Sequence, residues 1–508
     1  MASRARLDGG HATIAWTVEA ADLLTPVAAF LKLRRHLAGA DANGFLLESI
    51  EGGVARGRYS VIGLKPDLIW RCREGAVAID RDPSAAVPSC EPDPRHPIEA
   101  LRALIAESRI ELPFELPPMI GGLFGYLGYE MVRQMERLPN PPLDDLGLPE
   151  AMLLRPSLFA VFDNVRDELT LAVPLRPDGS TDSDTLWARG QALLAQARDA
   201  LSLELPLAEA PVDMIPPIPV EPRSNFTRDA FLASVRRIQE YVAAGDAFQV
   251  VPSQRFSAPF ALPAFALYRA LRRINPAPFL FFLDLGRDAD RFQLVGSSPE
   301  VLVRLRDGIV TVRPLAGTRP RGADPAEDGR LEAELLADPK ERAEHLMLVD
   351  LGRNDVGRVA VLGSVRVTES FVIERFSHVM HISSTVEGRL RPELDAVDAL
   401  IAGFPAGTLT GAPKIRAMEI IDEVEPTRRG TYAGCFGYFG ADGTMDTCIG
   451  LRMALVKDAT MHVQAGCGVV ADSVPEAEYE ETRQKARALF RAADAAVATA
   501  HALRRNAT

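Results

Sequence analysis

A proline-rich stretch divides this chain and limits which elements can run through it. Residues 205–224 contain six prolines. Proline lacks a backbone N–H and disfavours helix at the residue before it, so neither a helix nor a central strand can continue through this stretch. We therefore expect an N-terminal region over residues 1–204, an extended linker over residues 205–224 and a second region over residues 225–500.

The residues on both sides of this linker combine strand and helix patterns. Before it, β-like runs occur at residues 59–63 and 158–162. After it, the sequence predicts a helix over about residues 229–244 that ends at Gly245. The further predicted elements are strands at 248–251, 279–285, 300–305 and 309–312, a turn at Asp307-Gly308, and a helix at about 475–503.

Composition excludes several classes of protein. The formal net charge of −12 argues against a broad nucleic-acid surface. No apolar run approaches the ~18 residues that a membrane span needs, and the first residues lack the apolar core of a signal peptide. The five cysteines are odd in number and show no CxxC spacing, which indicates reduced thiols in a cytoplasmic protein.

Two short patterns, far apart in the sequence, each place two glutamates three positions apart. Glu341 and Glu344 form the first pair, and Glu478 and Glu481 form the second. Positions i and i+3 lie on one face of a helix, so each pair would point in one direction. Two facing pairs would supply four carboxylates, which suits a hard divalent cation such as Mg²⁺.

The alternative reading is that these pairs are solvated surface glutamates. Asp338-Pro339 is typical of a helix start, and Glu341 could close a capping box there. Helical steps onward from the pairs, however, reach Leu348 and Leu489, which should face the core. Acids on a core-facing stripe are expensive unless they are paired or metal-bound. Finding this stripe twice favours Mg²⁺-assisted chemistry on an anionic small molecule.

Several other segments carry chemistry that their own sequence leaves open. Residues 315–322 fit either an anion-binding turn or an ordinary turn. Residues 404–414 fail the Walker A spacing but could form an anion-binding helix N-terminus. Residues 465–470 could offer bare N–H groups to a carboxylate or mark a close strand crossing. Arg452 calls for a planar anionic partner, either a structural aspartate or a substrate carboxylate.

Taken together, the motifs resemble those of the chorismate-utilising enzymes, and within them the large component of anthranilate synthases. The matching segments are residues 245–251, 296–300, 315–322, 344–355, 410–414 and 478–482. The resemblance covers nearly all of residues 225–490 and, more sparsely, residues 46–49 and 121–126. It implies an α+β fold, a large two-sheet and mainly antiparallel sandwich with flanking helices, whose active site lies in the cleft between the sheets.

Two positions narrow the reaction within this family. Relatives that activate water have Lys in place of Gln249, and aminodeoxychorismate synthases typically have a nucleophilic Lys in place of Ala316. Neither residue here can serve in those roles. The resemblance therefore implies that ammonia attacks C2 of chorismate and that pyruvate elimination then gives anthranilate.

The resemblance also implies a role for each matching site residue. Glu341, Glu344, Glu478 and Glu481 would hold Mg²⁺, and Glu300 would be the general acid that protonates the departing C4 hydroxyl. His381, on a strand where a lone histidine is more often structural, would serve pyruvate elimination, and Gln249 would be the third catalytic residue. The residues implied to bind substrate are Thr318, Thr408, Tyr432, Arg452, Gly466, Gly468 and Lys485.

A feedback site for L-tryptophan is a further implication of the resemblance. The matching residues are Glu48, Ser49, Pro278, Phe279, Leu280, Gly437 and Tyr438. We expect L-tryptophan to inhibit the chain, with a strength that the sequence does not give.

The source of ammonia is expected to be a second protein. No cysteine lies in the GxCxGxQ-like setting of a glutamine amidotransferase. We expect a separate amidotransferase small subunit, in a heterodimer or heterotetramer. Two alternatives stay open: a 2-amino-2-deoxyisochorismate synthase that stops before pyruvate leaves, and a non-catalytic tryptophan-sensing subunit, which the presence of every site residue disfavours.

Overall fold

The N-terminal region of the computed structural model combines a few helices with long strands. The structure describes residues 2–39, 43–51, 55–85, 89–205, 222–376 and 379–505. The helices are α1 (Ala2–Asp8), α2 (Pro26–Leu33), η1 (Arg34–Ala38), α3 (Pro97–Glu107), η2 (Tyr129–Gln134) and α4 (Ser183–Ser202). The strands are β1 (Thr13–Ala20), β2 (Gly44–Glu51), β3 (Ala55–Arg73), β4 (Ala76–Asp80), β5 (Cys90–Asp93), β6 (Leu123–Leu127), β7 (Ala151–Asp163) and β8 (Glu168–Leu175).

The second region carries shorter strands and more helices. Its strands are β9 (Arg223–Ser224), β10 (Gln249–Val250), β11 (Ser253–Pro259), β12 (Phe279–Leu285), β13 (Phe292–Ser298), β14 (Val301–Arg306), β15 (Ile309–Val312), β16 (Leu315–Pro320), β17 (Arg366–Arg375), β18 (Val379–Arg389), β19 (Gly411–Ala412), β20 (Cys435–Phe439), β21 (Met445–Ile449), β22 (Met453–Lys457) and β23 (Thr460–Gly466). Its helices are α5 (Arg228–Ala244), α6 (Ala264–Ile274), η4 (Asp288–Asp290), α7 (Pro325–Ala337), α8 (Pro339–Gly357), α9 (Ala396–Gly403), α10 (Gly407–Thr410), α11 (Lys414–Val424) and α12 (Pro475–Arg505).

Hydrogen bonds join most of the strands into one network. One sheet contains 21 strands, and β10 and β19 form a separate pair. The strand pairings are antiparallel, which confirms the α+β class and the mainly antiparallel sandwich. The two expected layers are continuous with each other through this network. The two sequence regions also share it, because β2 pairs with β12 and β6 pairs with β20.

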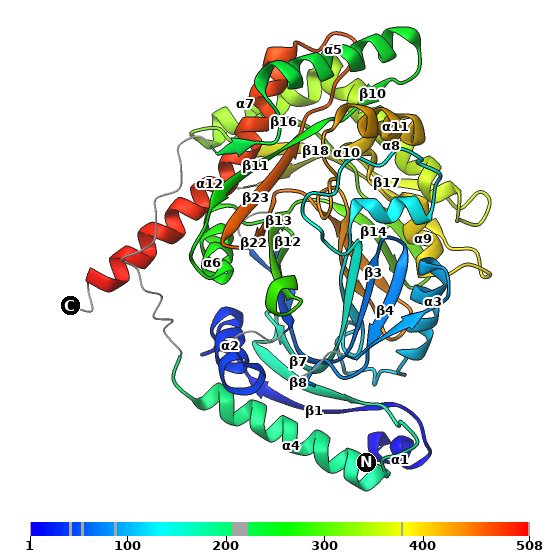
Figure 1. Cartoon of the computed structure of the whole chain (residues 1–508), viewed down its shortest axis with the longest axis vertical. Coiled ribbons are helices and arrows are strands. Elements are labelled where there is room, and N and C mark those ends of the chain that lie inside the picture. The colour runs from blue at the N-terminus through cyan, green and yellow to red at the C-terminus, as the bar shows by residue number, and fades with distance from the viewer. Residues whose placement is uncertain are drawn as a thin grey trace.

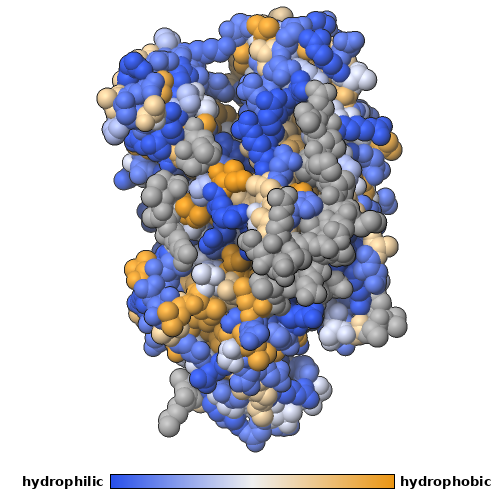
Figure 2. All heavy atoms as spheres, turned by 90° about the vertical axis from the view of Figure 1, so that its left-hand side faces the viewer, coloured by the Kyte–Doolittle hydropathy of each residue, from blue (hydrophilic) through white to orange (hydrophobic). Residues whose placement is uncertain are grey.

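Helices cover the sheet on its outer faces and bury its apolar side chains. Figure 1 shows α12 running along one side of the molecule, with α5 at one end and α4, beside β1 and β8, at the other. Phe30 of α2 and Phe265 of α6 pack with ring centroids 4.8 Å apart. Phe281 and Phe436 stack at 4.4 Å inside the sheet network. In Figure 2, apolar residues gather in the lower half of one face and hydrophilic residues dominate above them.

Local sequence signals predicted the bounds of several elements to within one residue. The predicted helix at 229–244 is α5, and Gly245 ends it with φ of +84°. The predicted strands at 279–285 and 309–312 are β12 and β15. The expected turn at Asp307-Gly308 joins β15 to β14. The strand predicted at 300–305 begins one residue later, at Val301.

Other predictions differ from the structure or fall outside it. The strand predicted at 248–251 shrinks to β10, because its strand partner β19 has two residues and Val469 adds only a single bridge to Val250. Most of the predicted linker, residues 206–221, lies outside the described residues. Among the described helices, none combines the length and the apolarity that crossing a membrane requires.

Candidate active site

Glu300 is a buried acid between β13 and β14. Its side chain is 7% exposed, and its neighbours are a hydroxyl and an amide. Thr408 Oγ1 lies 3.3 Å from Glu300 Oε1, and the Leu315 amide lies 3.4 Å from the same atom. Burial raises the pKa of Glu300 to about 8, since these few long hydrogen bonds offset little of the cost of dehydrating its charge. Glu300 is therefore protonated at neutral pH and can donate a proton.

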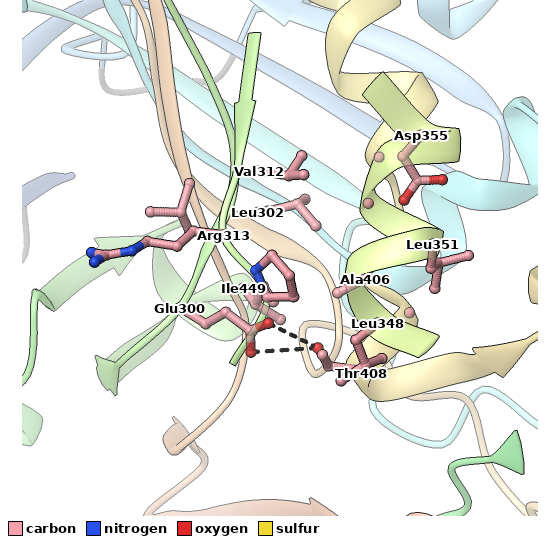
Figure 3. A pocket seen from close by; sticks show the side chains of 15 residues that line it. Glu300, Leu302, Val312, Arg313, Leu348, Leu351, Asp355, Ala406, Thr408 and Ile449 are labelled. Carbon is pink, nitrogen blue, oxygen red and sulfur yellow. Dashed lines mark hydrogen bonds between the residues drawn. The ribbon is translucent and has the colours of Figure 1, made fainter. Parts of the chain in front are cut away.

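A small cavity lies on one side of this acid. It measures about 40 Å³, and its lining includes Glu300, Thr408, Leu348 and Asp355. Figure 3 shows the side chains of Glu300 and Thr408 pointing toward each other beside helix α8. The other predicted substrate residues do not line this cavity.

His381 and Arg452 form a second polar group close to Glu300. His381 Nδ1 lies 2.9 Å from the Gly317 carbonyl oxygen, to which it must donate a hydrogen. Its Nε2 then accepts from Arg452 Nη2 at 3.3 Å. Burial, together with the charge of Arg452, lowers the pKa of His381 to about 4, so the ring is neutral at pH 7. Thr318 Oγ1 lies 3.1 Å from His381 Nδ1 and joins this group.

Arg452 interacts with both His381 and Glu300, and its backbone conformation is unusual. Its backbone has φ of +49°, a conformation that non-glycine residues adopt at a cost of about 1–3 kcal/mol. Burial lowers the pKa of Arg452, and the nearby Glu300 opposes that shift. A guanidinium in this setting remains charged and favours an anionic ligand.

Glycines bring bare backbone to the same region. A Cβ at Gly466 would lie 2.8 Å from the Pro252 carbonyl oxygen and 3.0 Å from the Tyr432 hydroxyl. A Cβ at Gly468 would lie 2.5 Å from Gln249 Nε2. Lys485 Nζ donates to the Gly466 carbonyl at 2.9 Å. A side chain at Gly466 would clash with the main chain of Pro252, and one at Gly468 would displace the Gln249 amide, so glycine at both positions keeps the region open.

Gln249 presents an unsatisfied acceptor. The residue is 4% exposed, and its Nε2 donates to Glu344 Oε1 at 3.4 Å. Its Oε1 is buried and has no hydrogen-bond partner. A buried acceptor without a partner costs about 1–3 kcal/mol, so this atom is ready to accept from a ligand.

The four predicted metal-binding glutamates lie on α8 and α12, and each pair has one member bound to a cation. Glu341 Oε1 lies 3.1 Å from Arg319 Nη1, and Glu481 Oε1 lies 2.7 Å from Lys485 Nζ. Glu341 therefore does not close a capping box, although Asp338 does cap α8. Among the described residues, no three His, Cys, Asp or Glu side chains converge closely enough to hold a metal ion.

The remaining glutamate of each pair fits a cation. Burial, followed by the charge of Glu341, raises the pKa of Glu344, and Glu481 adds to this effect. Burial also raises the pKa of Glu478, although hydrogen bonds from Ser473 and Cys467 oppose that shift. Its Oε2 is buried and has no hydrogen-bond partner among the described residues. Both pairs therefore contribute charge to one region, and a divalent cation could satisfy it if Arg319 and Lys485 moved aside.

The residues predicted to bind tryptophan lie on neighbouring strands and border two core clusters. Glu48 pairs with Leu280 across β2 and β12, and Leu280 belongs to one cluster, while Phe279 and Tyr438 pack on the other. The Glu48 carboxylate is already bound by Tyr268 at 2.6 Å and by Arg272 at 2.6 and 2.9 Å. Pro278 adjoins Phe279 in the chain, and Ser49 and Gly437 lie on β2 and β20. The structure brings these strands together.

Sequence analysis did not identify Arg319 as the partner of Glu341 or Arg272 as the partner of Glu48. Arg319 lies next to the predicted Thr318, inside a segment that was already of interest, so its position was a usable signal. Arg272 lies in α6, far from Glu48 in the sequence, and no local pattern connects the two. The assembled set contains a protonated acid, a neutral imidazole, a guanidinium and an excess of carboxylates. This set can protonate a leaving group and bind a polyanionic small molecule.

Comparison with known proteins agrees with this chemistry. The family model described as chorismate binding enzyme matches residues 65–491. Anthranilate synthase component 1 of Cereibacter sphaeroides is 54% identical, covering 96% of this chain and 95% of the relative. The protein of the same name from Thermus thermophilus is 45% identical, covering 94% and 97%.

Solved structures give the same picture. Anthranilate synthase component I from Streptococcus pneumoniae superposes with a TM-score of 0.72 and 34% identity, covering 85% of this chain and 92% of that one. MenF, the menaquinone-specific isochorismate synthase of Escherichia coli, has a TM-score of 0.70 and 18% identity, covering 95% of each chain. The second likeness is in fold alone.

Proposed function

Since the chain belongs to the chorismate-binding enzymes, and among them to the component 1 anthranilate synthases, we propose that it aminates chorismate with ammonia and eliminates pyruvate to give anthranilate. The observation that carries the proposal is Glu300, a buried carboxyl that keeps its proton at neutral pH. Such an acid can protonate a hydroxyl that leaves as water.

The first step joins nitrogen to C2 of chorismate. Ammonia forms the C2–N bond, the ring double bonds shift, and the C4–O bond breaks. Glu300 supplies the proton with which the C4 hydroxyl leaves as water. Gln249 supports ammonia as the nucleophile, because its free buried Oε1 can accept a hydrogen bond from ammonia and cannot act as a base that activates water.

The second step releases pyruvate. The C2 proton is lost, the bond from C3 to the enolpyruvyl oxygen breaks, and the ring becomes aromatic. The methylene carbon of the departing enolpyruvate takes up a proton to give pyruvate. His381 supports this step, since its neutral ring lies beside Arg452. Arg452, Tyr432 and the glycines Gly466 and Gly468 would hold the enolpyruvyl carboxylate. Thr318, Thr408 and Lys485 would complete the substrate pocket.

Glu341, Glu344, Glu478 and Glu481 would hold Mg²⁺, directly or through water. The ion would supply Lewis-acid chemistry and a template for the ring carboxylate. The unpartnered Oε2 of Glu478 and the raised pKa of Glu344 support this assignment. Removal of the metal with EDTA should abolish turnover.

Ammonia would come from a glutamine amidotransferase subunit in a heterodimer or heterotetramer. All five cysteines are free thiols, and four of them are buried. Burial raises the pKa of Cys435 to about 12 and raises that of Cys467 well above its ordinary value, so neither is a reactive thiolate. Free thiols also fit the cytoplasm.

L-tryptophan would inhibit the enzyme at the cluster formed by β2, β12 and β20. The pairing of β2 with β12 supports this, because a ligand there would contact strands from both sequence regions. Loss of activity on tryptophan titration is the expected result. Full activity at millimolar tryptophan would refute the inhibition.

The test of the proposed function uses the purified chain with chorismate, Mg²⁺ and excess ammonium, followed by anthranilate fluorescence. We expect a rising signal that EDTA abolishes and that glutamine alone does not produce. Chorismate loss without anthranilate or pyruvate would instead indicate an aminodeoxyisochorismate synthase. No consumption of chorismate would refute catalysis by the chain itself.

A further inference from the structure

A buried arginine lies behind the substrate residues without being one of them. The Arg429 side chain is 1% exposed and pairs with Glu425, whose side chain is 2% exposed. Arg429 Nε lies 3.0 Å from Glu425 Oε2, and Nη2 lies 2.6 Å from Glu425 Oε1. This fork leaves further guanidinium donors for other groups.

Those donors reach two main-chain carbonyls next to substrate residues. Nη1 donates to the Leu409 carbonyl at 2.7 Å, and Leu409 directly follows Thr408. Nη2 donates to the Val251 carbonyl at 2.7 Å, two residues after Gln249. One guanidinium therefore joins the segment that bears the nucleophile-facing residue to the segment that contacts Glu300.

The same guanidinium packs against two tyrosine rings, and its partner Glu425 binds Ser253 of β11. Its central carbon lies 5.7 Å from the ring centroid of Tyr432 and 5.0 Å from that of Tyr129. Its partner Glu425 accepts from the Ser253 amide at 2.8 Å and from the Ser253 hydroxyl at 2.9 Å. Ser253 pairs with Gly466 across β11 and β23.

We propose that Arg429 is a positioning residue for chorismate, fixing from one buried guanidinium the segments that carry Gln249, Thr408, Tyr432 and Gly466. The inference rests on the proposed function and adds a residue that does not touch the substrate. Stability alone does not account for the arrangement, because a buried ion pair is often no more stabilising than apolar side chains of the same volume. A planar fork, in contrast, sets several acceptors in fixed directions, which a lysine ammonium cannot do.

The test compares Arg429→Lys with a matched variant elsewhere. Arg133 is a similar fork: it donates to Glu130 and Asp422, and to the Leu138 carbonyl at 3.0 Å, but it contacts none of the proposed substrate segments. Both full-length variants are assayed for ammonia-dependent anthranilate formation and for thermal unfolding. Chorismate affinity is also measured by calorimetry with Mg²⁺ present and ammonium absent.

For Arg429→Lys we expect kcat/KM for chorismate to fall by about 10–100-fold, with weaker chorismate binding, since small displacements of positioned groups have effects of this size. The KM for ammonium should change much less. Arg133→Lys should lower the unfolding temperature while leaving KM and chorismate affinity within about twofold.

A second variant covers the case in which Arg429→Lys fails to fold. Glu425→Gln keeps the volume and one acceptor oxygen, so it should weaken chorismate binding in the same direction by a smaller factor. The inference is overturned if the wild type makes anthranilate while either folded Arg429 or Glu425 variant keeps wild-type chorismate affinity. A wild type that makes no anthranilate would instead count against the proposed function.

Discussion

Two buried glutamates in this molecule have opposite surroundings. Glu48, on β2, is bound by two nitrogens of Arg272 and by the Tyr268 hydroxyl, at 2.6 to 2.9 Å. Glu300, before β14, has one hydroxyl and one amide at 3.3 to 3.4 Å. The Glu48 carboxylate forms an ion pair with Arg272, whereas the Glu300 carboxyl is dehydrated and keeps its proton.

The difference shows that burial alone does not assign a role to an acid. A fully hydrogen-bonded ion pair ties β2 to α6 and fixes the local structure. An acid without such a partner costs stability and gains reactivity, because its pKa moves toward neutral pH. The surroundings of Glu48 therefore favour a fixed local structure, and those of Glu300 favour proton transfer.

The largest expected effect is on catalysis at Glu300. Glu300→Gln keeps the shape and the hydrogen bonds but cannot donate an acidic proton, so kcat should fall by about 10²–10⁴-fold. Steady-state anthranilate formation with ammonium measures this. Glu48→Gln is the control and should stay within a few-fold of wild type. Equal losses of kcat in the two variants would show that the two glutamates do not differ in their role in catalysis.

The next effect is on stability at Glu48. Glu48→Ala would leave the Arg272 guanidinium, whose side chain is 22% exposed, without its counterion. Breaking a buried pair in this way costs about 3–5 kcal/mol. Urea unfolding of the full chain should register this loss in the transition midpoint. If Glu48→Ala unfolds at the wild-type midpoint, the pair does not hold these elements together.

A smaller effect concerns the pH dependence of stability. Burial raises the pKa of Glu300 from an ordinary value of 4.5 to about 8. Between these pH values the folded protein holds a proton that the unfolded chain releases, so the contribution of Glu300 to stability falls as pH rises through this window. Glu300→Gln should remove that slope and make the variant more stable than wild type above pH 8.

This pH effect is read from unfolding temperatures of both proteins at pH 6, 7, 8 and 9. The wild type should lose stability relative to Glu300→Gln on moving from pH 6 to pH 8. A constant difference between the two proteins over this range would mean that Glu300 does not titrate there.

The smallest expected effect concerns the metal. Arg319 binds Glu341, and both side chains are partly exposed. An ion pair of this kind is worth about 0.2–1 kcal/mol, so Arg319→Gln should tighten Mg²⁺ binding by up to about fivefold. Calorimetric titration measures this. Arg313→Gln, which removes a cation paired with Glu374, is the matched control and should leave the affinity unchanged. Weaker binding in Arg319→Gln would show that Arg319 supports the site instead of competing with the ion.

Sequence predicted what local signals encode. Gly245 after an apolar-periodic stretch fixed the end of α5, and Asp307-Gly308 fixed the turn between β14 and β15. The two glutamate pairs were correctly assigned to helices, because the i, i+3 spacing and the cap at Asp338 are local. Motif resemblance supplied the α+β class, which the structure confirms, and the proposed site residues.

Sequence could not predict the long-range partners. Arg272 reaches Glu48, and Arg429 reaches Val251, across separations that leave no periodic trace. The strand expected at 248–251 was too long because its strand partner β19 has two residues and the further bridge from Val250 to Val469 does not extend it. Among the described residues, no three of the four carboxylates in the two glutamate pairs lie close enough to hold an ion together. Arg319 and Lys485 each bind one of these carboxylates, a choice of side-chain conformation that spacing does not encode.

The most direct test of the account is the protonation state of Glu300 itself. Infrared difference spectra of wild type minus Glu300→Gln, recorded from pH 5 to pH 10, isolate the carboxyl band of this residue. We predict a protonated-carboxyl band at pH 7 that disappears with a midpoint at about pH 8. A carboxylate band already complete at pH 6 would contradict the account, because Glu300 would then have no proton to give to the leaving hydroxyl.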